Sequence, residues 1–341
     1  MTVALFCRVV TASSPPAIEV DDLVKTYGDV DAVRGVSFTV PPGEVFGFLG
    51  PNGAGKSTTI NMLCTLARPT SGTARVSGFD VVGRRADVRR QIGLVFQDTT
   101  LDLYLTAAQN LRLHGDLYGI DAKVTPARID QMLEMVDLAD RRDKPVMTFS
   151  GGMKRRLEIA RGLMHSPRVL FLDEPTIGLD PQTRSSIWRY IRALQAAEGT
   201  TIFMTTHYMD EAEFCDRIAI MDRGEIVVLD TPEALKAAVG TDRVVLGTAD
   251  DDAALAELRE RFGIEAAVAE GAVTFHVESG EAFVPRLFAE LDVAITSVAV
   301  SRPTLDDVFM RYTGTTIRDA ETDGVADQNR ALMRAMAGAK R

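Results

Sequence analysis

The stretch GPNGAGKSTT, residues 50–59, constrains the fold of this chain more than any other. It matches the pattern G-x-x-x-x-G-K-[ST], whose fixed positions are Gly50, Gly55, Lys56 and Ser57. The apolar run EVFGFL precedes it, and STTINMLCTLA follows with apolar residues at near-helical spacing, so we expect a strand, a phosphate-binding loop and a helix. A glycine-rich turn that only joins two elements is the weaker alternative, because the Lys-Ser pair and both flanks fit phosphate binding.

The residues of this loop have separate predicted tasks. Glycines let successive N–H groups turn toward a phosphate, and the start of the helix adds partial positive charge. Lys56 is expected to reach the β- and γ-phosphates of a nucleotide and to take part in catalysis, while the Ser57 hydroxyl is expected to ligate Mg²⁺. The residues predicted to bind the nucleotide here are Gly50, Pro51, Asn52, Gly53, Ala54, Gly55, Lys56, Ser57 and Thr58.

Composition narrows the class of protein. A length of 341 residues accommodates one large or two ordinary domains with a sizeable core. The net charge of -10 argues against a protein that coats duplex nucleic acid, and no apolar run approaches the ~20 residues of a membrane-spanning helix. The opening MTVALFCRVV lacks a basic leader, so we expect residues 1–16 to be a tail and not a secretion signal. Cys7, Cys64 and Cys215 show no metal-ligand spacing, which favours a reduced cytoplasmic protein.

The segments around the loop predict an α/β fold with additional elements. Residues 17–40 alternate between apolar and polar, which predicts antiparallel strands broken at Tyr27. A tyrosine there can stack on adenine, although a tyrosine near a turn more often only packs. RPTSGTARVSGFDV predicts a hairpin, QIGLVFQ a strand that ends on Gln97, and residues 106–163 amphipathic helices.

A second glycine segment, FSGGMKRR, begins one of these predicted helices. Ser150, Gly151 and Gly152 are either an ordinary N-cap with a permissive turn or a second anion-binding helix start. In isolation the N-cap is the simpler interpretation. The acidic segment that follows in the chain gives a reason to prefer the functional one.

That segment is RVLFLDEPTIGLD, an apolar strand by pattern that ends on Asp173 and Glu174. Ligands bind at the carboxyl ends of strands in open α/β sheets, so Asp173 is expected to bind Mg²⁺ and Glu174 to orient or deprotonate the attacking water. Asp180, before Pro181, is a typical N-cap and need be nothing more. His207 lies where another apolar strand meets a helix. A lone histidine is more often structural, but at this edge it can contact the γ-phosphate and align the water or Glu174.

Seven features follow one another along residues 17–238, and these are Tyr27, GPNGAGKST, Gln97, FSGGM, LFLDEP, GLD and His207. Their order resembles that of the motifs of ATP-binding cassette (ABC) ATPases. The resemblance implies a P-loop NTPase fold with an antiparallel β subdomain and an α-helical subdomain, and an ATPase that uses ATP and Mg²⁺. It also implies a head-to-tail homodimer or pseudo-dimer, in which the phosphate loop of one subunit and the SGG segment of the other enclose each ATP. In that arrangement Gln97 contacts magnesium and senses the partner, and Asp180 lies at the dimer seam. The signature departs from the common LSGGQ at Phe149 and Met153.

The C-terminal part narrows the resemblance. Residues 242–316 predict the order βαββαβ of a small ferredoxin-like α+β domain, and residues 317–341 a flexible tail. The stretch SRPTLDDVFMRYTG is similar to the appendage of the daunorubicin/doxorubicin-resistance type of ATP-binding subunit. This implies a peripheral subunit on the cytoplasmic face of the membrane that powers export of a hydrophobic drug through a separately encoded permease, without nucleic acid. The appendage is either a stabilising or dimer-propping domain or a regulatory sensor.

Two other hypotheses remain at this point. The first is a non-transport cassette that acts on ribosomes or DNA, although DNA-repair versions carry long coiled-coil insertions and ribosomal versions usually carry two cassettes. The second is a soluble small-molecule kinase, in which the SGG segment would have no task. The sequence leaves the cargo and the permease undefined.

Overall fold

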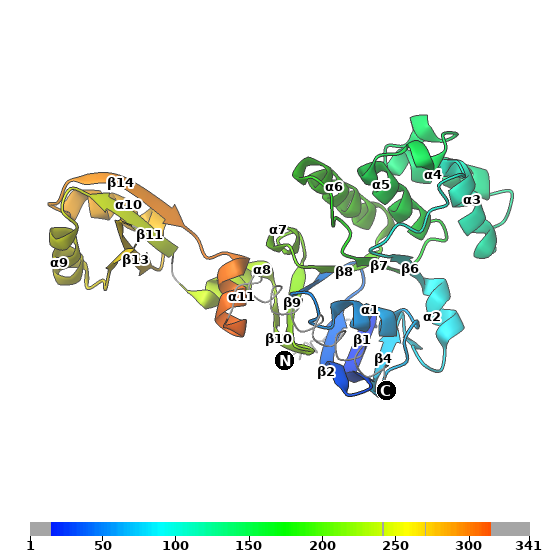
Figure 1. The fold of residues 1–341 in the computed structure, drawn as a ribbon, viewed down its shortest axis with the longest axis horizontal. Coiled ribbons are helices and arrows are strands. Elements are labelled where there is room, and N and C mark those ends of the chain that lie inside the picture. The colour runs from blue at the N-terminus through cyan, green and yellow to red at the C-terminus, as the bar shows by residue number, and fades with distance from the viewer. Residues whose placement is uncertain (1–14, 241, 270, 315–341) are drawn as a thin grey trace, which may run out of the picture. The chain divides into compact units, whose positions relative to one another are not determined.

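The computed structural model describes residues 15–240, 242–269 and 271–314 (Figure 1). Apart from Pro15 and Pro16, both predicted tails lie outside the described residues, as does Cys7. The described chain divides into two compact units, residues 15–228 and 229–314. The predicted domain limits, residues 17–238 and 242–316, stay predictions.

The first unit begins with an antiparallel sheet whose strand order is β2-β1-β4-β5. Its strands are β1 (Ile18–Tyr27), β2 (Val30–Val40), β4 (Ser71–Val76) and β5 (Phe79–Asp80). Ile18 lies opposite Val40 on one side and Val76 on the other, so the buried faces of three strands are in register. The predicted break at Tyr27 is confirmed, because β1 ends there and Gly28 adopts a positive φ in the turn.

A second sheet of six strands has the order β10-β9-β3-β8-β7-β6. Its strands are β3 (Val45–Leu49), β6 (Ile92–Val95), β7 (Val169–Asp173), β8 (Thr201–Thr206), β9 (Arg217–Asp222) and β10 (Glu225–Asp230). The neighbours from β9 through β6 pair in parallel. Every residue of β3 and β8 is buried, which explains why these strands have continuous apolar runs instead of alternation. Gln97 lies two residues beyond the end of β6, so that strand is shorter than predicted.

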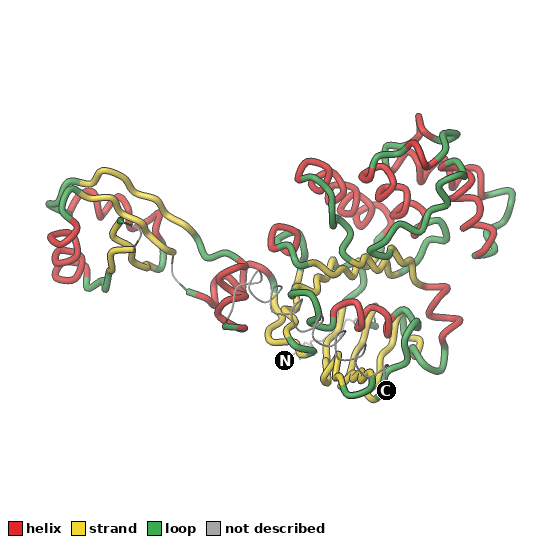
Figure 2. The backbone as a smooth tube through the Cα atoms, in the orientation of Figure 1, coloured by secondary structure: helices red, strands yellow, loops and turns green. Residues whose placement is uncertain are grey.

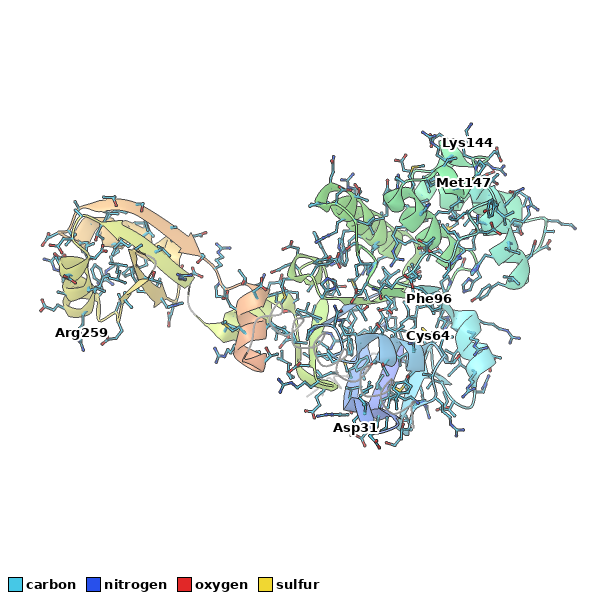
Figure 3. The ribbon with its side chains drawn as sticks, viewed as in Figure 1. Asp31, Cys64, Phe96, Lys144, Met147 and Arg259 are labelled. Carbon is cyan, nitrogen blue, oxygen red and sulfur yellow. The ribbon has the colours of Figure 1, made fainter. Side chains whose placement is uncertain are left out.

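Helices cover both faces of this sheet. They are α1 (Lys56–Leu63), α2 (Arg85–Gln91), α3 (Ala107–Leu117), α4 (Thr125–Met135), α5 (Gly151–Gly162), α6 (Pro181–Glu198) and α7 (Met209–Ala212), with 3₁₀ turns at Ala139–Arg141 and Val146–Thr148. Figure 2 shows α3 to α6 on one side of the six strands, and α1 with the antiparallel sheet on the other. The predicted P-loop NTPase fold with a β and an α-helical subdomain is confirmed. The two described cysteines, Cys64 (Figure 3) and Cys215, are buried free thiols, and burial raises the pKa of both.

A cluster of aromatic rings joins the two sheets. Phe38 of β2 stacks on Phe46 of β3 with centroids 5.5 Å apart, and Phe48 lies 5.1 Å from Phe203 of β8. Phe46, Phe48 and Phe203 are fully buried. The cluster therefore fixes β3, the strand that leads into the phosphate-binding loop.

The second unit contains α8 (Pro232–Val239), a four-stranded sheet with two helices, and α11 (Leu305–Thr313), which packs on α8. The sheet has the order β12-β13-β11-β14, and its elements are β11 (Asp242–Thr248), α9 (Asp251–Phe262), β12 (Ala267–Ala269), β13 (Ala272–Val277), α10 (Gly280–Glu290) and β14 (Ile295–Ser301). Val244, Leu246, Phe275 and Leu287 are among the residues of its separate core. The predicted βαββαβ order is confirmed.

Replacing Phe203 by Ala should lower the free energy of unfolding of the full chain by about 3–5 kcal/mol, because the change leaves a cavity between the two sheets. Urea unfolding measures this. Tyr104→Ala is the control, since Tyr104 is 84% exposed and its loss should change stability by less than about 0.5 kcal/mol. Equal effects of the two substitutions would contradict the role given to the aromatic cluster.

Candidate active site

The phosphate-binding loop connects β3 to α1 and is held close to β9. A Cβ atom on Gly50 would lie 2.2 Å from the carbonyl oxygen of Met221, and one on Gly55 would lie 2.4 Å from that of Ala32. Gly55 also has φ +104 as the N-cap of α1, a conformation that L side chains rarely adopt. Both glycines are therefore required by close backbone packing. In the remainder of the predicted loop, Asn52 and Gly53 are exposed, Pro51 and Ala54 are buried, and Thr58 is half-buried.

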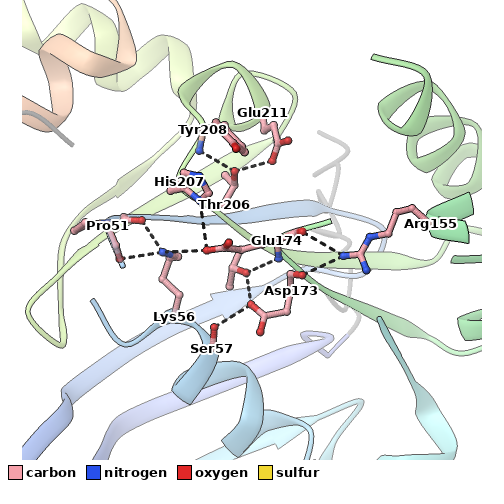
Figure 4. Close-up of polar contacts among 12 residues, drawn as sticks. Pro51, Lys56, Ser57, Arg155, Asp173, Glu174, Thr206, His207, Tyr208 and Glu211 are labelled. Atoms are coloured by element: carbon pink, nitrogen blue, oxygen red, sulfur yellow. Dashed lines mark hydrogen bonds and ion pairs between the residues drawn. The ribbon is translucent and has the colours of Figure 1, made fainter. Parts of the chain in front are cut away.

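Lys56 is almost completely buried beneath this loop. Its ammonium donates to the carbonyl oxygens of Gly50 at 2.6 Å and Pro51 at 3.0 Å, and lies 3.7 Å from Glu174 Oε1 (Figure 4). The lysine is thus preorganised at the inner side of the loop. A positive charge at this place is suited to phosphate oxygens.

Ser57 and Asp173 meet at the carboxyl end of β7. The Ser57 hydroxyl donates to Asp173 Oδ1 at 3.1 Å, and Thr205 of β8 donates to the same oxygen at 2.5 Å. Among the described residues, no group of three or more His, Cys, Asp or Glu side chains could hold a metal ion. One hydroxyl and one carboxylate nevertheless fit Mg²⁺, which keeps several waters and takes further oxygens from substrate phosphates.

Glu174 follows Asp173 in a strained conformation, with φ 46 and only 6% of its surface exposed. His207 Nδ1 approaches its Oε1 to 3.4 Å, which is an ion-pair distance and not an aligned hydrogen bond. Burial raises the pKa of Glu174, but His207 and Lys56 together outweigh it and hold the pKa below its ordinary value. Glu174 is therefore a carboxylate at neutral pH.

Arg155 is a site residue that the sequence interpretation missed. It lies on α5 and is buried, and its guanidinium donates to the carbonyl oxygens of Asp173 at 3.1 Å and Glu174 at 3.2 Å. It also donates to the Phe96 carbonyl at 2.5 Å, immediately before Gln97. The sequence shows three consecutive cations, KRR, and only the fold reveals which of them points inward. Arg155 connects the glycine signature helix to the acidic pair.

The structure brings together Lys56, Ser57, Asp173, Glu174 and His207, with Gly50 and Pro51 bound to Lys56 through their carbonyl oxygens, whereas the side chains of Ser150 and Asp180 cap other helices. Ser150 caps α5 by accepting from the Met153 N–H at 3.3 Å, and Asp180 caps α6 by accepting from the Thr183 N–H at 3.0 Å. Gly151 is exposed and Gly152 is buried. Gln97 is exposed beyond β6, the strand next to β7. Tyr27 is 49% exposed, with the Lys25 ammonium 4.6 Å from its ring centroid.

Glu211, on the short helix α7, was also missed. It is 1% exposed and accepts a hydrogen bond from the Thr206 hydroxyl at 2.6 Å. Burial raises its pKa from 4.5 to about 7. The sequence YMDEAE contains three acids, and their spacing alone did not identify which one turns inward.

Comparisons with known proteins identify the family of the chain. The family described as ABC transporter matches residues 33–177, and the one described as ATP-binding protein DrrA1-3-like, C-terminal domain, matches residues 231–313. The chain is 43% identical to daunorubicin resistance ATP-binding protein DrrA3 of Streptomyces coeruleorubidus, over 87% of this chain and 96% of that protein. It is 38% identical to linearmycin resistance ATP-binding protein LnrL of Bacillus subtilis, over 89% of this chain and 100% of that protein. It is also 41% identical to the Nod factor export ATP-binding protein I of Paraburkholderia xenovorans, over 89% of this chain and 99% of that protein.

Solved structures give the same fold. The structure of cbiO1 from Clostridium perfringens, part of an ABC transporter complex, has a TM-score of 0.62 and 28% identity, and covers 73% of this chain and 97% of that one. A dimeric ATP-binding cassette in a post-hydrolysis state with ADP and Pi has a TM-score of 0.57 and 28% identity. The match covers 63% of this chain and 98% of that one. The fold is that of an ABC ATPase. The chain belongs to the ATP-binding subunits of ABC transporters, in the family of the daunorubicin-resistance proteins, and hydrolyses ATP.

The buried carboxyl of Glu211 should make stability depend on pH. Its pKa is higher in the folded chain than in the unfolded one, so its contribution to stability is fully present below about pH 4.5 and is lost as pH rises through about 7. We expect the free energy of unfolding of wild type, relative to that of Glu211→Gln, to fall by about 3 kcal/mol as pH rises over this range. Urea unfolding at several pH values measures it. The exposed neighbour Asp210, replaced by Asn, should give a curve parallel to wild type, whereas a parallel curve for Glu211→Gln would refute the assignment.

Proposed function

We propose that this chain is the ATP-hydrolysing motor of an exporter of a hydrophobic, drug-like compound, and that it acts on a separately encoded membrane permease. The observation that carries the proposal is the cluster of Lys56, Ser57, Asp173, Glu174 and His207 at one edge of a parallel sheet, in which Lys56 and Glu174 are buried. The relatives named for daunorubicin resistance, linearmycin resistance and Nod factor export support export as the direction.

Within the site, each side chain has a proposed task. Lys56 binds the β- and γ-phosphates, and Ser57, Asp173 and Gln97 hold Mg²⁺, which supplies charge neutralisation on the phosphates when bound. Glu174 accepts the proton of the attacking water or orients that water. His207, 3.4 Å from Glu174, keeps this carboxylate in line with the γ-phosphate. Tyr27 stacks on the adenine.

The motor works as a head-to-tail homodimer or pseudo-dimer in this proposal. The starts of α5 and α6 lie together, since a Cβ on Gly152 would meet Thr183 Cγ2 at 2.5 Å. Ser150 and Asp180 there are exposed and make their side-chain hydrogen bonds within their own helix starts. These two exposed helix starts form the surface that we assign to the ATP of a second copy, with Asp180 at the seam. A similar cassette solved as a dimer supports this.

The helical subdomain and the segment after Gln97 are the proposed contact with the permease. Large apolar side chains are exposed in and beside these segments, and those of Phe96, immediately before Gln97, and Met147 are labelled in Figure 3. The others are Leu103, Tyr104, Leu113, Leu117, Tyr118 and Val124. Among the described residues, no helix is both long and apolar enough to cross a membrane. A peripheral position on the cytoplasmic face of the membrane follows from this contact.

Replacing Glu174 by Gln should lower the rate of ATP hydrolysis by about 10²–10⁴-fold, because the water loses its proton acceptor. ATP affinity should persist, and the variant should accumulate as an ATP-dependent dimer. ATPase assays and sedimentation with and without Mg-ATP measure both effects. Glu134→Gln, on the exposed side of α4, is the control and should behave as wild type. Undiminished turnover in Glu174→Gln would exclude Glu174 as the base.

Replacing Lys56 by Ala should weaken ATP binding by about 10- to 100-fold, since charged hydrogen bonds to the phosphates are lost. Binding of a fluorescent ATP analogue measures the affinity. Lys123→Ala, at an exposed position of the helical subdomain, should leave it unchanged. Retained affinity in Lys56→Ala would contradict the proposed phosphate site. The export itself is tested by ATP-dependent drug efflux from cells that express the chain with a candidate membrane permease, compared with cells that express Glu174→Gln; equal efflux from both would contradict the proposed motor.

A further inference from the structure

The turn that carries His207 is held from behind by a single buried carboxylate. The Thr206 hydroxyl donates to Glu211 Oε2 at 2.6 Å and accepts from the Tyr208 N–H at 2.9 Å. The residues before and after His207 are thus joined through one hydroxyl to Glu211 (Figure 4). Backbone hydrogen bonds to the carbonyl oxygens of Thr206 and Tyr208 also hold the turn, and Glu211 adds the side-chain contact that joins its two ends.

A cation from another element faces the same carboxylate. Arg184 lies in the first turn of α6, where its backbone N–H donates to the Asp180 carbonyl at 2.9 Å. Its guanidinium lies 4.0 Å from the centroid of the Tyr208 ring, and its Nε lies 3.8 Å from Glu211 Oε1. Within the described part of the chain, both of these atoms are buried and neither has a hydrogen-bond partner. An approach of about 1 Å between α6 and α7 would convert the pair into a charge-assisted hydrogen bond.

The charges around Glu211 come from several elements, and those that act on it are Arg184 of α6, His207 of the turn, Glu174 after β7 and Arg155 of α5. Burial outweighs the favourable cations, so the ionised form costs stability at neutral pH. A costly ionisable group beside a catalytic site is more often retained for function than a surface charge is. An ordinary core role would be met equally well by an amide or an apolar side chain.

We propose that Glu211 and Arg184 are positioning residues for ATP hydrolysis. Glu211 fixes the Thr206–Tyr208 turn so that His207 stays against Glu174, and Arg184 ties this turn to the start of α6 next to Asp180. The inference rests on the proposed roles of His207 and Glu174. It adds a physical connection, inside one chain, between the proposed dimer seam and the histidine that aligns the base.

The test is a double-mutant cycle in the full-length chain, using Glu211→Gln, Arg184→Gln and the double variant. Each single change should lower kcat for ATP hydrolysis by about five- to tenfold while the Kd for ATP stays within about twofold, and the double variant should lose no more than one single variant. Asp210→Asn, on the same short helix but exposed, is the matched control and should keep the wild-type kcat. Additive losses, or losses that reside in Kd, would overturn the proposal.

The pH dependence separates positioning from packing. Only the ionised carboxylate pairs with Arg184, and the carboxyl takes up its proton as pH falls through about 7. The ratio of kcat between wild type and Glu211→Gln should therefore be largest at pH 8 and approach one at pH 6, since groups common to both proteins cancel in the ratio. A ratio that does not change with pH would show that Glu211 only packs.

A second measurement does not depend on turnover. Hydrogen exchange of residues 204–212 should slow when the full-length chain binds Mg-ATP, and this protection should be lost in Glu211→Gln at saturating ATP. Equal protection in both proteins would overturn the proposal. His207→Ala distinguishes the two levels of the account: if it leaves kcat unchanged, the proposed role of His207 fails. If it lowers kcat while Glu211→Gln does not, only the present inference fails.

Discussion

The site depends on the buried contact between the Lys56 ammonium and the Glu174 carboxylate, which lie 3.7 Å apart. Burying either charge alone would be strongly unfavourable at such low exposure, so each charge offsets the cost of burying the other. Lys56 begins α1 and Glu174 follows β7, so the contact forms only when β3, β8 and β7 are in register. The parallel sheet therefore does more than support the loop, because it brings Lys56 and the acidic pair Asp173 and Glu174 to one edge.

Unfavourable features concentrate at this edge. Glu174 has a positive φ, Glu211 is buried with a pKa near neutrality, and Arg155 is buried against backbone carbonyls. Such features persist when the surrounding packing is strong enough to hold them. Here the fully buried strands and the aromatic cluster supply that packing, and these unfavourable groups lie around the proposed catalytic site.

Much of the fold was predictable because its signals are local. The glycine loop, the acidic pair and the histidine each lie at the end of an apolar strand, and parallel strands bring such ends together. The apolar pattern predicts a strand that ends on Gln97, whereas β6 ends two residues earlier. Arg155 and Glu211 could not be identified, because each is one of several like charges in a row and only tertiary packing selects the one that turns inward. The tasks proposed for Ser150 and Asp180 require a second copy, so they do not follow from the contacts within one chain.

The central claim is that two copies of this chain enclose each ATP, and one measurement tests it most directly. That measurement is an experimental structure of the Glu174→Gln chain with Mg-ATP. The account predicts that the γ-phosphate contacts Lys56 of one copy and the Ser150–Gly151 helix start of another. A γ-phosphate held by a single copy, with the Ser150 segment of its neighbour turned elsewhere, would contradict it.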